Sequence, residues 1–183
     1  MRVCAVICEY NPFHNGHARH LALAREKSGA DFMLCLMSGA LTQRGAFARH
    51  DKWLRARMAL LGGADLVLEL PCRFACAPAP DFASGGVALL RALNVVTHLS
   101  FGCEAQSLDI LFAARDALRD ESPAFQTVLK EALDRGLPYP RARALAAESA
   151  SGLSGLAEQI ALPNTALALE YLQALPDDIS AVP

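Results

Sequence analysis

Two histidines near the N-terminus, His14 and His17, flank the dipeptide Asn15-Gly16 and are the residues best placed to do chemistry. They follow a continuous apolar run at residues 3–8 and precede a segment with helical periodicity. On the first turn of a helix, residues three apart share one side. Two imidazoles there can donate to phosphate oxygens, and the unpaired N–H groups of the helix end attract the same anion. The pattern therefore predicts a nucleotide phosphate site, which Gly16 lets the backbone approach closely.

Two other interpretations of the histidines are open at this stage. One is that they only cap the helix or lie on its surface. The other is a metal site, because His20 extends the pair to a ridge of three histidines. The usual helical metal pair is four residues apart, and successive steps of three drift around the helix. Cys72 and Cys76 have no second cysteine pair nearby to complete a zinc site, so no metal ligand is predicted.

The segments that must position the histidines alternate between short apolar runs and longer amphipathic ones. Strands are predicted at residues 3–8, 32–37, 64–70 and 95–101, and helices at residues 17–27, 52–61 and 82–93. Gly29 stands where the first helix is expected to end. This order is typical of an α/β fold with a doubly wound, Rossmann-like parallel sheet. Ligands bind such sheets beyond the carboxyl ends of the strands, which is where the histidines fall.

After residue 104 the pattern changes to helices alone, at residues 108–118, 124–133, 141–150 and 165–175. We therefore expect two parts, a nucleotide-binding α/β domain at residues 1–104 and a helical C-terminal appendage at residues 105–183 that packs on it. No further strand is expected in the appendage.

The composition limits the possible partners. The chain of 183 residues is 53% hydrophobic and 20% charged, which indicates a folded globular protein. Its net charge of -2 provides no overall positive field, so an RNA partner must be met by a local patch. No apolar run approaches the ~20 residues of a membrane span, and the first is too short for a signal peptide. We expect a cytoplasmic protein with no membrane partner and reduced cysteines.

Several motifs resemble one family closely. The pattern His-x-Gly-His after a first strand is shared by the nucleotidyltransferase superfamily, whose members make or break a bond at the α-phosphate of ATP. The longer string from Glu9 to His17 is similar to the bacterial tRNA(Met) cytidine acetate ligase family. Further matches, in the same order, are Met37-Ser38-Gly39, Gln43-Arg44-Gly45, Lys52-Trp53, residues 64–71, residues 99–102 with Glu104, and Pro163-Asn164. Ala40, Ala46-Phe47 and Cys103 depart from the family pattern.

The resemblance implies a reaction in two steps. Acetate attacks the α-phosphate of ATP to give acetyl-adenylate and pyrophosphate, and the wobble cytidine of elongator tRNA(Met) then takes the acetyl group as N4-acetylcytidine. Mg²⁺ is expected to bridge the phosphates. The resemblance also implies an ATP site formed by Ile7, Cys8, Glu9, Tyr10, Asn11, Pro12, Phe13, His14, Asn15, Gly16, His17, Ala18, Arg19, His20, Gly102 and Asn164.

The first step needs no protein nucleophile, so the protein has to align acetate and stabilise charge on the phosphoryl oxygens. His14, His17 and Lys52 are the predicted catalytic residues. Lys52 belongs to a basic stretch that also contains Arg44, Arg49, His50, Arg55 and Arg57, with Asp51 as its only acid. This stretch either holds the triphosphate or the tRNA backbone, or is a solvated helix face.

Other polar and aromatic residues have open roles. Glu9, at the end of the first strand, either binds ribose or fixes the turn. Asp65 is expected in a turn after Gly62-Gly63. Glu69 is expected at the carboxyl end of its strand, too far from Asp65 (~13 Å) for joint catalysis. Trp53, the only tryptophan, is expected in the core rather than as a base-stacking platform.

Two further functions are compatible with the residues. One is an adenylyltransferase acting on a small phosphorylated substrate, and the other is a non-catalytic nucleotide- or RNA-binding fragment. Members of the family are longer than this chain, and nothing after Asn164 resembles the arginine-containing motif of their later part. We therefore expect a form that is truncated relative to the family, keeps nucleotide affinity and has weak or absent ligase activity.

Overall fold

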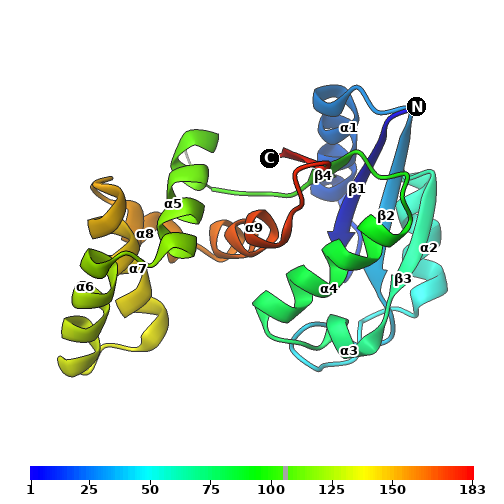
Figure 1. Cartoon of the computed structure of the whole chain (residues 1–183). Coiled ribbons are helices and arrows are strands. Elements are labelled where there is room, and N and C mark those ends of the chain that lie inside the picture. Colours follow the sequence, from blue (N-terminus) through cyan, green and yellow to red (C-terminus); the bar gives the residue numbers. More distant parts are fainter. Residues whose placement is uncertain (105–106) are drawn as a thin grey trace. The chain divides into compact units, whose positions relative to one another are not determined.

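The computed structural model describes residues 1–104 and 107–183. Its internal contacts divide the chain into two compact units (Figure 1). The first unit contains Met1–Phe101 together with Ala174–Pro183, and the second contains Gly102–Gln173.

A five-stranded, all-parallel sheet forms the centre of the first unit, with the strand order β3-β2-β1-β4-β5. The strands are β1 (Val3–Cys8), β2 (Phe32–Ser38), β3 (Leu66–Leu70), β4 (His98–Ser100) and β5 (Ser180–Val182). From the central β1 the chain proceeds to β2 and β3 on one side, and then crosses to β4 on the other. The order therefore reverses between β1 and β4, which is where ligands bind in sheets of this kind. The predicted α/β fold with a doubly wound parallel sheet is confirmed.

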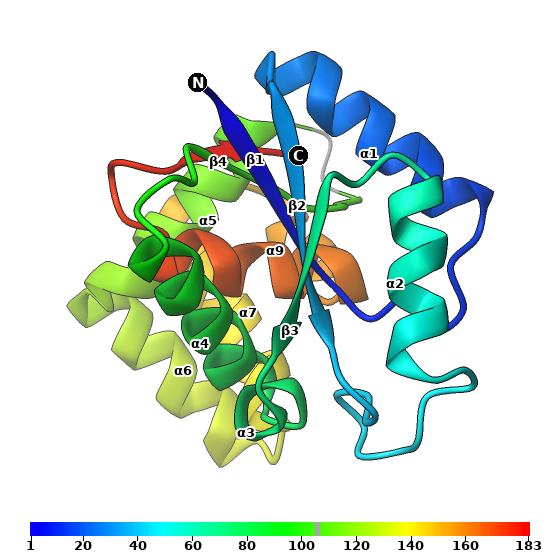
Figure 2. The same cartoon turned by 90° about the vertical axis from the view of Figure 1, so that its right-hand side faces the viewer.

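Helices cover both faces of this sheet. They are α1 (Asn15–Ser28), α2 (Lys52–Leu61), the short α3 (Cys72–Ala75) and α4 (Ala79–Ala92). Figure 2 shows α1 and α2 on one side of the strands and α4 on the other. Buried side chains of α1 and α2 share a core with alternate residues of β1 and β2, among them Cys4, Val6, Cys8, Met33, Cys35 and Met37. The opposite face of β1 meets α4, since a side chain at Gly86 would contact Ile7.

Local sequence signals explain most of the helix ends. Gly29 ends α1 in the left-handed conformation (φ 60°), and its N–H bonds back to the last turn, as predicted. Helix α2 has the predicted bounds and begins after Asp51. Strand β4 is shorter than predicted, because its pairing with β1 begins only at His98. Helix α3 was not predicted, since a four-residue helix has no detectable period.

The expectation that no strand follows residue 105 is wrong. Residues Ser180–Val182 form β5, which pairs in parallel with β4. Ser180 N donates to Thr97 O at 2.9 Å, and Phe101 N donates to Val182 O at 3.2 Å. Three residues are too few for strand periodicity to stand out, so only the ladder to β4 identifies them. The division at residue 104 and the packing of the appendage stay predictions.

The second unit is helical, as predicted for this part of the chain. It contains α5 (Leu108–Asp120), α6 (Pro123–Asp134), α7 (Tyr139–Ser151), α8 (Leu156–Ile160) and nearly all of α9 (Pro163–Ala174). Leu111, Phe125, Leu156 and Leu169 are buried in this unit. Within residues 1–104 and 107–183, no helix has the length and apolarity needed to cross a membrane.

Candidate nucleotide-binding site

The turn between β1 and α1 holds the two predicted histidines at the start of the helix. His14 is the N-cap of α1, and its Nδ1 accepts a hydrogen bond from Gly16 N at 3.1 Å. His17 reciprocates, because its Nδ1 accepts from His14 N at 3.3 Å. The capping role considered for these histidines is therefore present, as a reciprocal capping box.

This capping box fixes which nitrogen of each ring carries a proton. A backbone N–H can donate only to an unprotonated nitrogen, so Nδ1 is the acceptor and the proton of each neutral ring lies on Nε2. The His14 and His17 rings stack with centroids 3.7 Å apart. Among the described residues, neither Nε2 has a hydrogen-bond partner. Two N–H donors are thus left available beside the amides at the start of α1.

Burial and the neighbouring histidines set the charge of His17. Half-buried His17 has a pKa lowered to about 4, first by desolvation and then by repulsion from His14 and His20. Its ring is therefore neutral near pH 7. A neutral ring donates a hydrogen bond without carrying a charge of its own, whereas the amides of the helix end supply a partial positive charge.

Aromatic packing makes the turn rigid. Tyr10, in the left-handed region (φ 49°), is buried and contacts the Phe13 ring edge-on at 4.9 Å and the His17 ring at 4.8 Å. The Tyr10 hydroxyl lies 3.5 Å from Cys35 Sγ on β2. Phe13 in turn lies against Gly62, where a side chain would collide with its ring. The backbone that carries the histidines is therefore tied to the core.

Gly16 has a specific steric reason to be glycine. A Cβ at this position would lie 2.9 Å from His14 Cε1 and 3.0 Å from His14 Nδ1. Any side chain would therefore displace the ring that caps α1. Glycine at position 16 is therefore needed to keep the His14 ring in place. The close approach of a ligand, which the sequence suggested, is a separate reason for it.

Glu9 and Asn11 fix the loop that follows β2. Glu9 Oε1 accepts from Gln43 N at 2.6 Å, and Asn11 Oδ1 accepts from Arg49 N at 2.6 Å. Two roles were considered for Glu9, ribose binding and fixing the turn. The structure shows the side chain in the second kind of role, because it links the turn after β1 to the loop after β2. No local pattern predicted this hydrogen bond, because its partners lie more than thirty residues apart.

Arg55 differs from the rest of the basic stretch, because its side chain is fully buried. Its guanidinium donates to four backbone carbonyls: Glu9 O at 2.6 Å, Ser38 O at 3.2 Å, His50 O at 3.0 Å and Gly39 O. Burial lowers its pKa. Arg55 therefore joins the carboxyl ends of β1 and β2 and is not available to a phosphate. One signal was visible in the sequence, since Ala59 lies one turn further along the same inner face.

Lys52 lies at the start of α2 and pairs with Glu69 at the carboxyl end of β3. Lys52 Nζ is 2.6 Å from Glu69 Oε2 and 5.3 Å from the centroid of the Trp53 ring. Trp53 is 76% exposed, so the expectation of a core tryptophan is wrong. The apolar positions facing the sheet are filled by smaller residues, such as Ala56 and Ala59, and the indole is left outside.

Asp65 has the structural role predicted for it. It precedes β3, and its Oδ2 accepts from Met33 N at 2.7 Å and from Arg25 at 2.5 Å. Burial raises the pKa of Asp65, but these hydrogen bonds and the Arg25 charge outweigh burial and hold it below its ordinary value.

The remaining residues of the predicted ATP site differ in their access to solvent. The side chains of Ile7, Cys8 and Tyr10 are buried, whereas Asn11, His14, Asn15, Gly16 and Arg19 are exposed. His20, on α1, contacts β4, with its Nε2 3.0 Å from Ser100 Oγ. It therefore stands at the point where the strand order reverses. Which of these residues contact ATP stays a prediction.

Gly102 and Asn164 both belong to the second unit, where Glu104, two residues after Gly102, bonds to Asn164. Glu104 Oε1 accepts from Asn164 Nδ2 at 2.7 Å, and its Oε2 accepts from Thr165 N at 2.7 Å and Thr165 Oγ1 at 3.0 Å. Burial raises the pKa of Glu104, but these hydrogen bonds outweigh burial and hold the pKa below its ordinary value. The motifs at residues 99–104 and 163–164 are thus joined at the first turn of α9. A nucleotide contact by Gly102 or Asn164 stays a prediction.

No preformed metal centre accompanies these residues. Within the described chain, no group of three or more His, Cys, Asp or Glu side chains is arranged to hold a metal ion. Cys72 Sγ and Cys76 Sγ lie 3.7 Å apart without further ligands of this kind. The expected Mg²⁺ stays a prediction.

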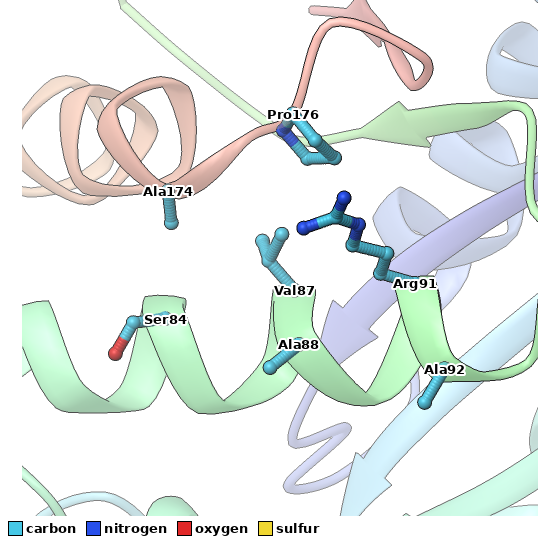
Figure 3. Close-up of a pocket in the computed structure, with 7 residues that line it drawn as sticks. All are labelled: Ser84, Val87, Ala88, Arg91, Ala92, Ala174 and Pro176. Atoms are coloured by element: carbon cyan, nitrogen blue, oxygen red, sulfur yellow. The ribbon is translucent and has the colours of Figure 1, made fainter.

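A hollow in the first unit lies away from these residues. It has a volume of about 570 Å³ and is lined by α4 and by Ala174 and Pro176 (Figure 3). The figure shows Val87 and the Arg91 guanidinium reaching from α4 toward the segment of Pro176. None of the predicted site residues lines it.

The parallel sheet and the capping histidines at the carboxyl end of β1 define an α/β nucleotidyltransferase. The HIGH Nucleotidyl Transferase family model matches residues 1–182. The chain therefore belongs to the HIGH nucleotidyl transferase family, which confirms the resemblance drawn from the motifs.

Within this family, the chain is similar to proteins named tRNA(Met) cytidine acetate ligase and to solved structures of TmcAL. The tRNA(Met) cytidine acetate ligase of Acetivibrio thermocellus is 44% identical over 176 residues, which are 96% of this chain and 42% of the relative. That of Clostridium perfringens strain SM101 is 41% identical over 182 residues, 96% of this chain and 45% of the relative. A crystal structure of Thermotoga maritima TmcAL bound with alpha-thio ATP is similar with a TM-score of 0.90 and 36% identity, covering 100% of this chain and 46% of that chain. This chain thus spans less than half the length of these relatives.

Proposed function

We propose that this chain binds ATP at the β1–α1 turn and activates acetate as acetyl-adenylate for transfer to the wobble cytidine of tRNA(Met). One observation carries the proposal: His14 and His17 accept their capping bonds through Nδ1, which leaves both Nε2–H groups for phosphate oxygens. Support also comes from the relatives named tRNA(Met) cytidine acetate ligase and from the neighbour bound with an ATP analogue.

The proposed chemistry balances without a protein nucleophile. A carboxylate oxygen of acetate attacks the α-phosphorus, the bond to the bridging oxygen breaks, and pyrophosphate leaves with the electron pair. The cytidine amine then attacks the acetyl carbonyl, AMP leaves, and the amine loses a proton to solvent. The histidine Nε2–H groups and the amides of α1 stabilise the charge that develops on the phosphoryl oxygens. No step is assigned to Mg²⁺.

Acetate-dependent exchange of labelled pyrophosphate into ATP, measured without tRNA, tests the first step. Two substitutions keep the helix cap but remove the outer donor: His14→Asn, because asparagine is a good N-cap, and His17→Gln, because glutamine suits the third helical position. We expect each to reduce exchange by about 100-fold, the loss typical of one donor to a developing oxyanion. His98→Ala, a histidine on β4, is the matched control and should leave exchange unchanged.

The outcomes separate the alternatives. Exchange that persists in both variants would contradict the assigned role of the histidines. Exchange that requires a phosphorylated small molecule in place of acetate would favour an adenylyltransferase. ATP binding by calorimetry without any exchange would favour a nucleotide-binding module.

A further inference from the structure

Two aromatic side chains, one in the loop before α2 and one in its first turn, are exposed to an unusual degree. Phe47 is 82% exposed and Trp53 is 76% exposed, whereas the next aromatic ring, Tyr139, is 55% exposed. Leaving two large rings in water forgoes the stabilisation that their burial would provide. A pair of this kind, so close in the chain, indicates a surface that is covered by something else.

The loop that carries Phe47 holds it in a defined place. Leu41 and Phe47 form an antiparallel bridge, closed by Thr42 N to Ala46 O and Ala48 N to Ala40 O, both at 2.9 Å. The side chains of Glu9 and Asn11 anchor the same loop to the β1–α1 turn. Phe47 is therefore presented on an ordered support, which reduces the entropy lost when a partner binds.

Arginines without an ion pair lie close to the two rings in the chain. Arg44, Arg49 and Arg57 are exposed, and none of them forms an ion pair with any described residue. Arg57 lies one helical turn after Trp53 on the outer side of α2. Asp51, the acid of this stretch, is occupied as the cap of α2, where it accepts from Trp53 N and Leu54 N at 2.9 Å. The local field is thus positive although the chain as a whole is acidic.

A cavity of about 250 Å³ adjoins Trp53. Its apolar wall includes Met37, Ala56 and Val67, and its polar groups include the ion pair of Lys52 and Glu69. An aromatic wall, apolar contacts and a carboxylate form the combination that holds a flat base with an amino group, since carboxylates accept from such groups.

We propose that Phe47, Trp53 and the three arginines form a binding surface for single-stranded RNA. The two rings stack on unpaired bases, the arginines contact the phosphates, and the cavity receives one base that carries an amino group. The inference rests on the proposed function only for the identity of the RNA, because stacking rings among arginines are a general arrangement for unpaired nucleic acid.

Trp53 allows a direct test, because it is the only tryptophan of the chain. We would titrate the full chain with oligocytidylate and follow the tryptophan fluorescence. The expected result is saturable quenching whose affinity falls as salt rises, with a log–log slope near -2, since each phosphate contact contributes about -0.7.

Variants measured by the anisotropy of labelled oligocytidylate localise the contact. Phe47→Ala and Trp53→Ala should each weaken binding by about 5- to 150-fold, the range for loss of one stacked base. Each arginine-to-alanine change should weaken binding and make the slope about 0.7 less negative. Leu61→Ala removes a side chain that is 81% exposed at the far end of α2 and should leave affinity unchanged. Circular dichroism checks that each variant is folded.

Three results would overturn the inference: no saturable quenching, equal losses in Leu61→Ala and Trp53→Ala, or quenching on raising protein concentration without RNA. The last would assign the surface to a second copy of the chain. Pyrophosphate exchange by the unmodified chain is recorded on the same preparation. Exchange without RNA binding counts against this inference alone, and RNA binding without exchange counts against the proposed function alone.

Discussion

The first turns of α1 and α2 both follow a strand and carry basic residues, yet they use them in opposite ways. At α1 the cap is a pair of histidines, whose Nε2–H groups have no hydrogen-bond partner among the described residues. At α2 the cap is the carboxylate of Asp51, which takes two of the amides that an anion would need. The buried Arg55 is also occupied, by four carbonyls. The number of basic residues in a segment therefore does not tell how many donors a ligand can reach.

The largest expected effect concerns the buried arginine of α2. Arg55→Ala should destabilise the fold by about 3 kcal/mol, because four buried or partly buried carbonyls would lose their donor and a cavity would remain. Urea unfolding measures this loss. Arg57→Ala, exposed on the same helix, is the matched control and should change stability by no more than about 0.5 kcal/mol. If the two variants were equally stable, Arg55 would not be the link between the strand ends.

The next effect concerns the capping histidines of α1. Gly16→Ala should reduce acetate-dependent pyrophosphate exchange by at least about tenfold, because the new Cβ would displace the His14 ring. Stability should change little, since alanine favours a helix over glycine. Exchange kinetics and urea unfolding on the same sample distinguish the two. Normal exchange would show that the position of the His14 ring does not matter for the chemistry.

A substitution of Lys52 tests whether α2 contributes to nucleotide binding. If Lys52 contacts the triphosphate as predicted, Lys52→Ala should weaken ATP binding about tenfold in calorimetry, the value of one charge-assisted hydrogen bond. Glu69→Gln breaks the same exposed ion pair and is the matched control, with no loss of ATP affinity expected. An unchanged ATP affinity in Lys52→Ala would leave α1 as the sole helix of the phosphate site.

The smallest expected effect is a pH dependence from His17. Its pKa is about 4 in the folded protein and near 6.5 when unfolded, so the unfolded chain binds the proton more tightly. Its contribution to stability is therefore complete above pH 6.5 and is lost as the pH falls toward 4. Because His17 is partly exposed, the expected decrease in the free energy of unfolding is on the order of 1 kcal/mol. Unfolding curves of His17→Gln should lack this part of the acid dependence, and identical curves would contradict the lowered pKa.

Much of the fold followed from local patterns. The apolar runs at β1 and β2, the helix at α2 and the glycine that ends α1 were all predicted, because burial and backbone conformation constrain these residue types locally. Strand β5 and helices α3 and α8 were not, since each is too short to show a period. The histidine turn was found for the same local reason: its residues are adjacent in the chain.

The sequence by itself determined the class of sheet, the place of His14 and His17 and the family motifs. Only the tertiary structure decided how those residues are used: that Arg55 is buried and Trp53 exposed, that Glu9 and Asn11 hold a loop, and that Glu104 joins Asn164. The physical reason is distance along the chain. A hydrogen bond between residues tens of positions apart forms only when the sheet brings them together, so no local pattern encodes it.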